Sequence, residues 1–292
     1  MRLTVRVPAT SANLGPGFDC FGLALDLCNE VRLDLEAPPG VEWAGEGADE
    51  LPTDGTDLVS RSMAAVAREA GLPLPVFSLR GRNAIPLERG LGSSSAAAVA
   101  GVVAASKVLA LGIDEDPYSI FSLAAAIEGH PDNAAPAVYG GFTIVAGGAV
   151  RRLDTHPDLR PVVIVPGDVR VSTAAARAAL PAQVPHADAV FNASHAALMV
   201  VALTEDPSLL GAAMQDRLHQ EARLSLAPEI AEVYELLRSA RIPVCVSGSG
   251  PSLLAFERID GPDVASAIGP VPTGWVIESL AVRARGVELH LG

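Results

Sequence analysis

The chain has 292 residues, enough for one large domain or two smaller ones, and 49% of them are hydrophobic, which predicts a packed globular protein and excludes a disordered one. The formal net charge of -13 at pH 7 repels nucleic acid and anionic membranes, so neither is an expected partner. We expect a cytoplasmic protein, because the three cysteines lack metal-ligand spacing and the sequence shows neither a signal-peptide pattern nor a long apolar run.

Hydrophobic periodicity divides the first half of the chain into strands and helices. Strands are expected at 3–7, 27–35, 76–79 and 143–146, and helices at 56–70, 117–128 and over the Ala/Val-rich run that the segment at 83–96 opens and that ends at Leu111. The helix that ends at Leu111 is small and apolar on every face, which predicts that it is buried. A polar loop is expected between the first two strands, over 8–18.

A polar stretch around 153–160 contains Pro157 and is interpreted as a soft boundary between two domains, 1–155 and 156–292. The second half is expected to contain strands at 162–165, 244–246, 253–256 and 275–282 and helices at 172–180, 186–203 and 228–240. Strands and helices do not alternate regularly, so the pattern favours an α+β fold over a βαβ fold.

Glycines and serines cluster directly before the buried helix, from Pro86 to Ala96. Gly90 and Gly92 allow positive φ and a close approach to a ligand, and the start of a helix offers free N–H groups to an anion. No G-x-x-x-x-G-K-S/T pattern is present, which excludes a Walker-type ATP site. The segment therefore favours a phosphate-binding loop over a plain glycine turn with a serine N-cap.

Three further segments concentrate polar groups. The turn at 247–252 is explained equally well by a β-turn or by a second wall of the phosphate site. The loop that ends at Asp19 offers a carboxylate to a ligand ammonium, or it is an ordinary Asx-type turn between strands. The third, 128–133, follows a helix and is either a group of functional ionisable residues or a solvated turn capped by Gly129.

These four segments, in this order, resemble the GHMP kinase superfamily of small-molecule kinases over nearly the whole chain. The segments at 8–19 and 129–136 are similar to those of the homoserine kinases, and the G-E-H segment of galactokinase- and mevalonate kinase-type members is absent. The resemblance implies an α+β fold in two parts, an N-terminal ATP-binding part and a C-terminal ferredoxin-like part, with the active site between them.

The resemblance also implies the residues of the site. The ATP phosphates are expected to contact Pro86, Leu87, Glu88, Arg89, Gly90, Leu91, Gly92, Ser93, Ser94, Ser95 and Ala96, supported by Gly248, Ser249 and Gly250. The substrate L-homoserine is expected to contact Asn13, Asp19, His130, Arg177 and Arg223. Asp19 would pair with its ammonium and the two arginines with its carboxylate, because guanidinium and carboxylate form bidentate pairs. Without the resemblance, both arginines are explained by solvated helix faces.

Magnesium is implied as the metal that accompanies ATP, with Ser94 and Glu128 as candidate ligands, although the family's acidic ligand has a different spacing in some members. The implied reaction is direct phosphoryl transfer from ATP to homoserine, which gives O-phospho-L-homoserine for threonine biosynthesis. Two alternatives stay open, another GHMP small-molecule kinase and a non-catalytic metabolite-binding member of the fold. A homodimer is compatible with the resemblance, but the residues themselves do not establish it.

Overall fold

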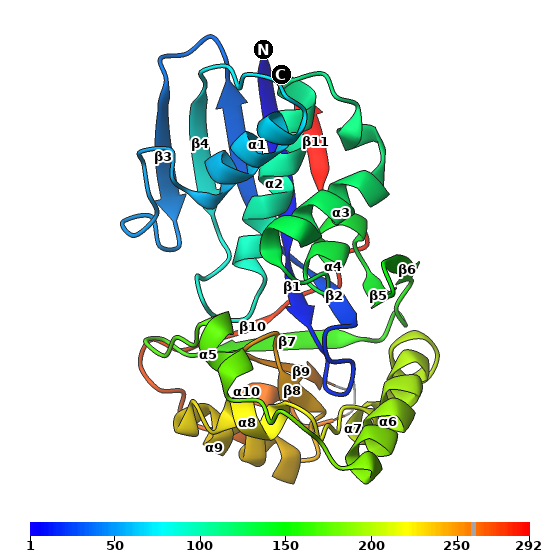
Figure 1. Cartoon of the computed structure of the whole chain (residues 1–292). Coiled ribbons are helices and arrows are strands. Elements are labelled where there is room, and N and C mark those ends of the chain that lie inside the picture. Colours follow the sequence, from blue (N-terminus) through cyan, green and yellow to red (C-terminus); the bar gives the residue numbers. More distant parts are fainter. Residues whose placement is uncertain (258–260) are drawn as a thin grey trace.

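The computed structural model describes residues 1–257 and 261–292. Its strands are β1 (Arg2–Ala12), β2 (Phe21–Asp34), β3 (Gly40–Gly45), β4 (Ser78–Asn83), β5 (Phe142–Ala146), β6 (Ala149–Leu153), β7 (Arg160–Val165), β8 (Val244–Val246), β9 (Leu253–Glu257), β10 (Val276–Ser279) and β11 (Glu288–Leu291). Its helices are α1 (Leu58–Glu69), α2 (Ser93–Val108), α3 (Pro117–Glu128), α4 (Ala134–Tyr139), α5 (Thr173–Ala178), α6 (His186–Thr204), α7 (Leu210–Ala213), α8 (Gln220–Leu224), α9 (Pro228–Ser239) and α10 (Val264–Ile268), with 3-10 turns η1 (Ile113–Glu115) and η2 (Pro207–Leu209). Figure 1 shows two parts stacked one above the other.

The larger sheet belongs to the N-terminal part and has the order β11-β1-β2-β4-β3, with β5 and β6 extending from β2. Strand β1 continues to Ala12, so the loop expected from residue 8 was placed too early. Pairing with β2 stabilises this extension, and a register shift between Pro8 and Ala9 accommodates the proline, which cannot donate to the strand ladder. The true loop between β1 and β2, in blue, reaches down into the lower part of the molecule (Figure 1).

Helices α1 to α4 cover one face of the larger sheet (Figure 1). Helix α2 is buried along most of its length, as predicted, and α1 packs closely across it at Gly101. A Cβ at Gly101 would lie 2.5 Å from the Val59 carbonyl oxygen, so only glycine permits this approach. Helix α3 spans the predicted residues because Asp116 accepts hydrogen bonds from its first turn and Gly129 ends it in a left-handed conformation.

The smaller sheet is antiparallel and has the order β10-β7-β9-β8, which is the strand order of a ferredoxin-like fold. Helix α9 packs on β8, and α10 packs on α9. The apolar side chains of this sheet and its helices form a second core around Ile164, Ile230 and Leu253. The predicted two-part α+β fold is therefore confirmed.

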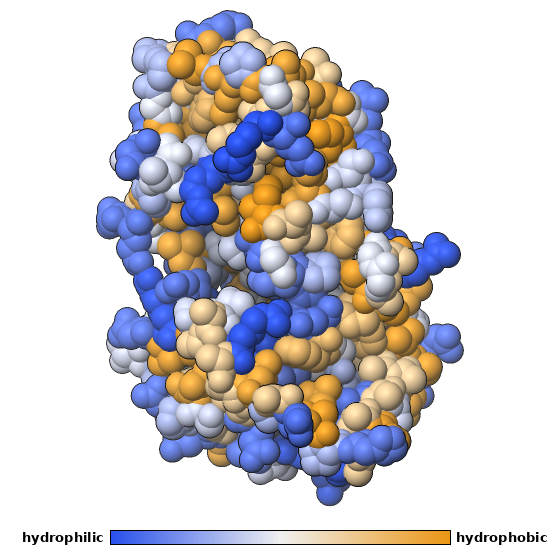
Figure 2. All heavy atoms as spheres, in the orientation of Figure 1, coloured by the Kyte–Doolittle hydropathy of each residue, from blue (hydrophilic) through white to orange (hydrophobic). Residues whose placement is uncertain are grey.

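The predicted boundary near residue 155 falls between β6 and β7, hence between the two sheets, and it stays a prediction because β11 returns to the larger sheet beside β1. Among the described residues, α6 alone is long and apolar enough to cross a membrane, by length and composition, which is weak evidence for a span. Figure 2 shows hydrophilic residues gathered across the middle of one face, where the two parts meet.

Candidate active site

Three loops are fastened to one another where the two parts meet. The N–H of Thr10 donates to the Leu91 carbonyl at 3.0 Å, which ties the end of β1 to the segment before α2. The Ser247 hydroxyl donates to the Gly90 carbonyl at 2.7 Å, and the N–H of Gly248 donates to the Ala12 carbonyl at 3.1 Å. Segments far apart in sequence are thereby held as one surface.

The loop before α2 has the backbone that an anion site requires. Gly90 and Gly92 have φ values of 73° and 70°, and a Cβ at Gly90 would lie 2.2 Å from the Ser247 carbonyl oxygen. Gly92 is the N-cap of α2 and has no side chain to cap the helix, so the first-turn N–H groups are left for a ligand.

Arg89 anchors this loop to the C-terminal part. Its Nε donates to the Pro166 carbonyl at 3.1 Å, and its guanidinium also donates to Gly167. Burial lowers the pKa of the Arg89 guanidinium, and the nearby charge of Arg170 acts in the same direction.

A cavity of about 490 Å³ opens in front of the loop. The predicted phosphate-contacting residues 86–94 and Ala96 line it, as do Gly248 and Ser249. Its other walls include apolar and amide side chains that the sequence analysis did not single out: Asn29, Val31, Trp43, Leu51, Leu58, Val59 and Asn83. Ser95 and Gly250 are not among its lining residues.

A second, smaller cavity of about 30 Å³ adjoins the first. All five residues predicted to contact the acceptor substrate line it: Asn13, Asp19, His130, Arg177 and Arg223. Five residues line both cavities: His130, Asn133, Thr173, Gly248 and Ser249. A group in one cavity and a group in the other would therefore meet beside these shared residues.

Asp19 and Arg177 both line the small cavity and form an ion pair with each other. The two nitrogens of the Arg177 guanidinium lie 3.1 and 2.8 Å from the two Asp19 carboxylate oxygens, although the residues are 158 positions apart. The Asp19 N–H donates to the Asn13 side-chain oxygen at 3.0 Å, and the Asn13 amide donates to Gly248 at 2.9 Å. Asn13 thus holds Asp19 against the glycine-rich turn.

Arg223 is buried, with 6% of its surface exposed, and its guanidinium donates to the Gly248 carbonyl. Its Nε has no hydrogen-bond partner among the described residues. Burial lowers the pKa of Arg223, while Asp132 and Asp19 act in the opposite direction. An unpaired donor on a buried cation next to a cavity favours an anionic ligand.

His130 stands where the two cavities join. Its Nδ1 lies 3.4 Å from Asp132 Oδ1, and this carboxylate raises the pKa of His130 against the opposing effect of burial. Beside it, the Asn133 side-chain oxygen accepts a 2.7 Å hydrogen bond from the Thr10 hydroxyl, which leaves its NH₂ group for a ligand. The sequence analysis did not predict Asn133 and Thr173 as site residues, although Asn133 lies in the segment from 129 to 136 that it had singled out.

Glu128 lies at the end of α3, facing the start of α2. One of its oxygens, Oε2, accepts hydrogen bonds from the Ser94 hydroxyl at 2.8 Å and the Ser95 hydroxyl at 2.7 Å. The two predicted metal-ligand candidates are thus brought together at the start of α2, where Ser94 also lines the larger cavity.

Comparison with known proteins agrees with this geometry. Residues 57–141 match the family model for the GHMP kinases N terminal domain, and residues 198–268 match that for the GHMP kinases C terminal. The chain is 47% identical to the homoserine kinase of Leifsonia xyli, with 98% of this chain and 91% of that protein covered. It is 43% identical to the homoserine kinase of Clavibacter michiganensis, with 99% of this chain and 94% of that protein covered.

A crystal structure of homoserine kinase from Cytophaga hutchinsonii superimposes with a TM-score of 0.83 at 30% identity, over 99% of this chain and 97% of that one. The chain is therefore a GHMP kinase, a small-molecule kinase that uses ATP. Within that superfamily it belongs to the homoserine kinase family, as the four sequence segments had predicted.

Proposed function

We propose that this protein transfers the γ-phosphoryl group of ATP to the hydroxyl of L-homoserine, which yields O-phospho-L-homoserine for threonine biosynthesis. The observation that carries the proposal is the pair of adjoining cavities. One is lined by the glycine-rich anion loop, and the other by one carboxylate and two arginines. The smaller cavity therefore offers matching charges to both ends of an amino acid.

In this assignment, Asp19 and Asn13 hold the ammonium of homoserine, and Arg177 and Arg223 hold its carboxylate. The hydroxyl then extends toward Asn133 and His130, where the two cavities join. Phosphoryl transfer needs in-line positioning and charge neutralisation more than covalent help from the protein. The N–H groups of the loop at 90–94 stabilise negative charge on the transferred group.

Magnesium fits the residues at the start of α2. Among residues 1–257 and 261–292, no group of three or more His, Cys, Asp or Glu side chains is arranged to hold a metal by itself. Magnesium with a nucleotide needs only one or two carboxylates besides the phosphates, and Glu128 with Ser94 supplies hard oxygen donors of that kind. When bound, Mg²⁺ neutralises phosphate charge.

We assign no dedicated catalytic base. The residue nearest to that role is His130, and Asp132 stabilises its protonated form by raising its pKa. A ring whose protonated form is favoured in this way is better suited to stabilise phosphate charge than to accept a hydroxyl proton. The hydroxyl proton then passes to the transferred phosphate.

The test is ADP release from Mg-ATP by the purified protein, measured with L-homoserine, L-serine, L-threonine, mevalonate and shikimate. Strong turnover with L-homoserine alone supports the proposal. Turnover with another alcohol would keep the kinase and overturn the substrate assignment. Without turnover on any of the five, a non-catalytic binding role becomes the better explanation.

The enzyme is proposed to work in the cytoplasm without nucleic-acid or membrane partners, an assignment supported by the net charge of -13. A homodimer stays part of the proposal, and sedimentation of the purified protein tests it.

A further inference from the structure

The loop that carries Asn13 and Asp19 has an unfavourable backbone. Asn13, Leu14 and Asp19 have φ values of 70°, 49° and 54°, in the left-handed region, which is uncommon for residues other than glycine and is tolerated better by Asn and Asp than by Leu. Such a conformation persists only where neighbouring groups hold it in place. Those neighbours therefore control the position of the homoserine-binding side chains.

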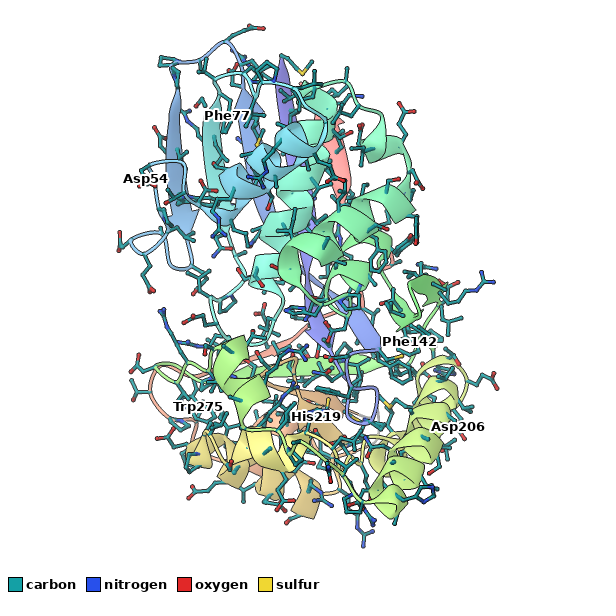
Figure 3. All side chains as sticks on the ribbon, viewed as in Figure 1. Asp54, Phe77, Phe142, Asp206, His219 and Trp275 are labelled. Atoms are coloured by element: carbon teal, nitrogen blue, oxygen red, sulfur yellow. The ribbon has the colours of Figure 1, made fainter. Side chains whose placement is uncertain are left out.

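The groups that hold the loop come from the C-terminal part of the chain. His219 Nε2 donates to the Gly15 carbonyl at 2.7 Å, and its ring stacks on Phe18 with the centroids 5.1 Å apart. Figure 3 places His219 beside the loop that descends from the larger sheet. His219 thus contacts the loop on both sides of its turn.

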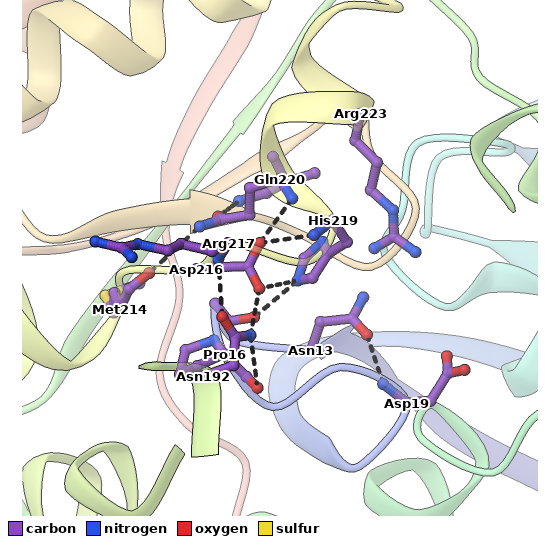
Figure 4. A network of polar contacts seen from close by, with 12 residues as sticks. Asn13, Pro16, Asp19, Asn192, Met214, Asp216, Arg217, His219, Gln220 and Arg223 are labelled. Atoms are coloured by element: carbon purple, nitrogen blue, oxygen red, sulfur yellow. Dashed lines mark hydrogen bonds and ion pairs between the residues drawn. The ribbon is translucent and has the colours of Figure 1, made fainter. Parts of the chain in front are cut away.

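A buried carboxylate fixes His219 in turn. Asp216 is completely shielded from solvent and accepts from the backbone N–H of His219 at 2.8 Å and from the Asn192 amide at 2.6 Å. The Asn192 amide also reaches the Pro16 carbonyl, at 3.5 Å. Figure 4 shows this polar network around the loop residues.

The imidazole of His219 is neutral at pH 7, because burial lowers its pKa to about 4. Its proton must sit on Nε2, since the Gly15 carbonyl can only accept. Nδ1 has no partner in the described part of the chain. Nε2 also lies 3.7 Å from Asp216 Oδ1, and its hydrogen bond to Gly15 is directed at the homoserine-binding loop.

His219 is also connected to both arginines of the site, directly to Arg223 and through Phe18 to Arg177. Arg223 follows His219 by one helical turn, and its N–H donates to the His219 carbonyl at 3.1 Å. The guanidinium carbons of Arg223 and Arg177 lie 5.3 and 5.9 Å from the centre of the Phe18 ring. Displacement of His219 would therefore move the loop, the ring and the arginines together.

We propose that His219 is a positioning residue of the homoserine site, which holds the 13–19 loop in its productive conformation through the Nε2–Gly15 hydrogen bond and the stack on Phe18. This inference rests on the proposed function. It assigns to His219 no contact with homoserine itself, since His219 lines neither cavity. Its effect on binding passes through Asp19 and Arg223.

The test compares two amide substitutions that differ in reach. In His219→Gln the amide nitrogen occupies about the place of Nε2 and can still donate to Gly15, whereas in His219→Asn it stops at the place of Nδ1. His195→Gln is the matched control, because His195 also stacks on a phenylalanine and bonds a carbonyl, but on α6 outside both cavities. KM for homoserine and for ATP, kcat and Tm are measured for each.

We expect His219→Asn to raise the KM for homoserine about tenfold and to leave the KM for ATP within about twofold, because a buried carbonyl loses its donor. His219→Gln should restore the homoserine KM to within about threefold of wild type, and His195→Gln should change neither. Equal homoserine KM values in the Asn and Gln variants, or a parallel rise in the KM for ATP, would overturn the proposal.

Two further measurements separate the outcomes. Phe18→Leu keeps the Gly15 hydrogen bond and removes the ring stack, so it should also raise the homoserine KM selectively. If His219→Asn does not fold, the homoserine KM of Phe18→Leu decides whether the proposal stands. Absence of homoserine turnover by the wild-type protein counts against the proposed function, whereas unchanged KM values in variants of an active enzyme count against His219 alone.

Discussion

Substitution of Arg177 by alanine tests the carboxylate site most directly. The change removes a guanidinium that makes two contacts with Asp19, at 3.1 and 2.8 Å, and that lies beside the small cavity. A charged hydrogen bond contributes about 1.5–3 kcal/mol. The Arg177 side chain is 41% exposed, so solvent screening places the effect at the lower end. About 1.5 kcal/mol corresponds to a rise of roughly tenfold in the KM for homoserine.

The assay is steady-state ADP release with each substrate varied in turn. Arg238→Ala is the matched control, because Arg238 also pairs with a carboxylate, on Glu235, and lies over an aromatic ring, that of Tyr234, but away from both cavities. The KM for ATP should stay within about twofold in both variants. An equal rise in both KM values for Arg177→Ala would refute a carboxylate-binding role.

Three other predictions follow from the site. Glu128→Gln should raise the Mg²⁺ concentration for half-maximal activity about tenfold, since it removes the carboxylate beside Ser94; an unchanged Mg²⁺ titration would argue against ligation. His130→Gln should keep kcat within about tenfold of wild type, whereas loss of a true base costs about 10²–10⁴-fold. Burial depresses the folded-state pKa of His219 to about 4, below its unfolded value of 6.5, so the free energy of unfolding should fall as the pH decreases from 6.5 to 4. Urea unfolding measured across this pH range should show a shallower fall for His219→Gln than for the wild type. Parallel curves for the two proteins would contradict this prediction.

Local chemistry explains which elements the sequence could predict. Helix α3 was placed correctly because its cap, its first proline and its terminal glycine are all local signals. Strands β3, β6 and β11 were missed because short, partly exposed strands depend on partners that the sequence does not identify. Helix α4 was missed because Pro136 stands inside it, which is normally a sign against a helix.

The residues of the site also divide into those that local sequence signals identify and those that only the folded structure reveals. Glycine-rich and motif-bearing loops identified the segments at 8–19, 86–96 and 247–252, and the structure brings them together. Thr173 was interpreted as part of a helix start, and nothing local indicates that it lies between two cavities. Asp216 and His219 lie in the polar loop before α8, and only tertiary contacts show that they are buried. The roles assigned to individual residues stay predictions.

The return of β11 to the larger sheet changes what a break in the backbone would do. Leu3 pairs with Leu291 and Arg6 with Glu288, so the last strand is held along β1 after the chain has passed through the smaller sheet. A cut by a protease between 154 and 159 would leave two pieces, and the second would still supply a strand to the sheet of the first. The nicked protein should therefore stay assembled and copurify as a pair of fragments, while either piece made alone would lack part of that sheet.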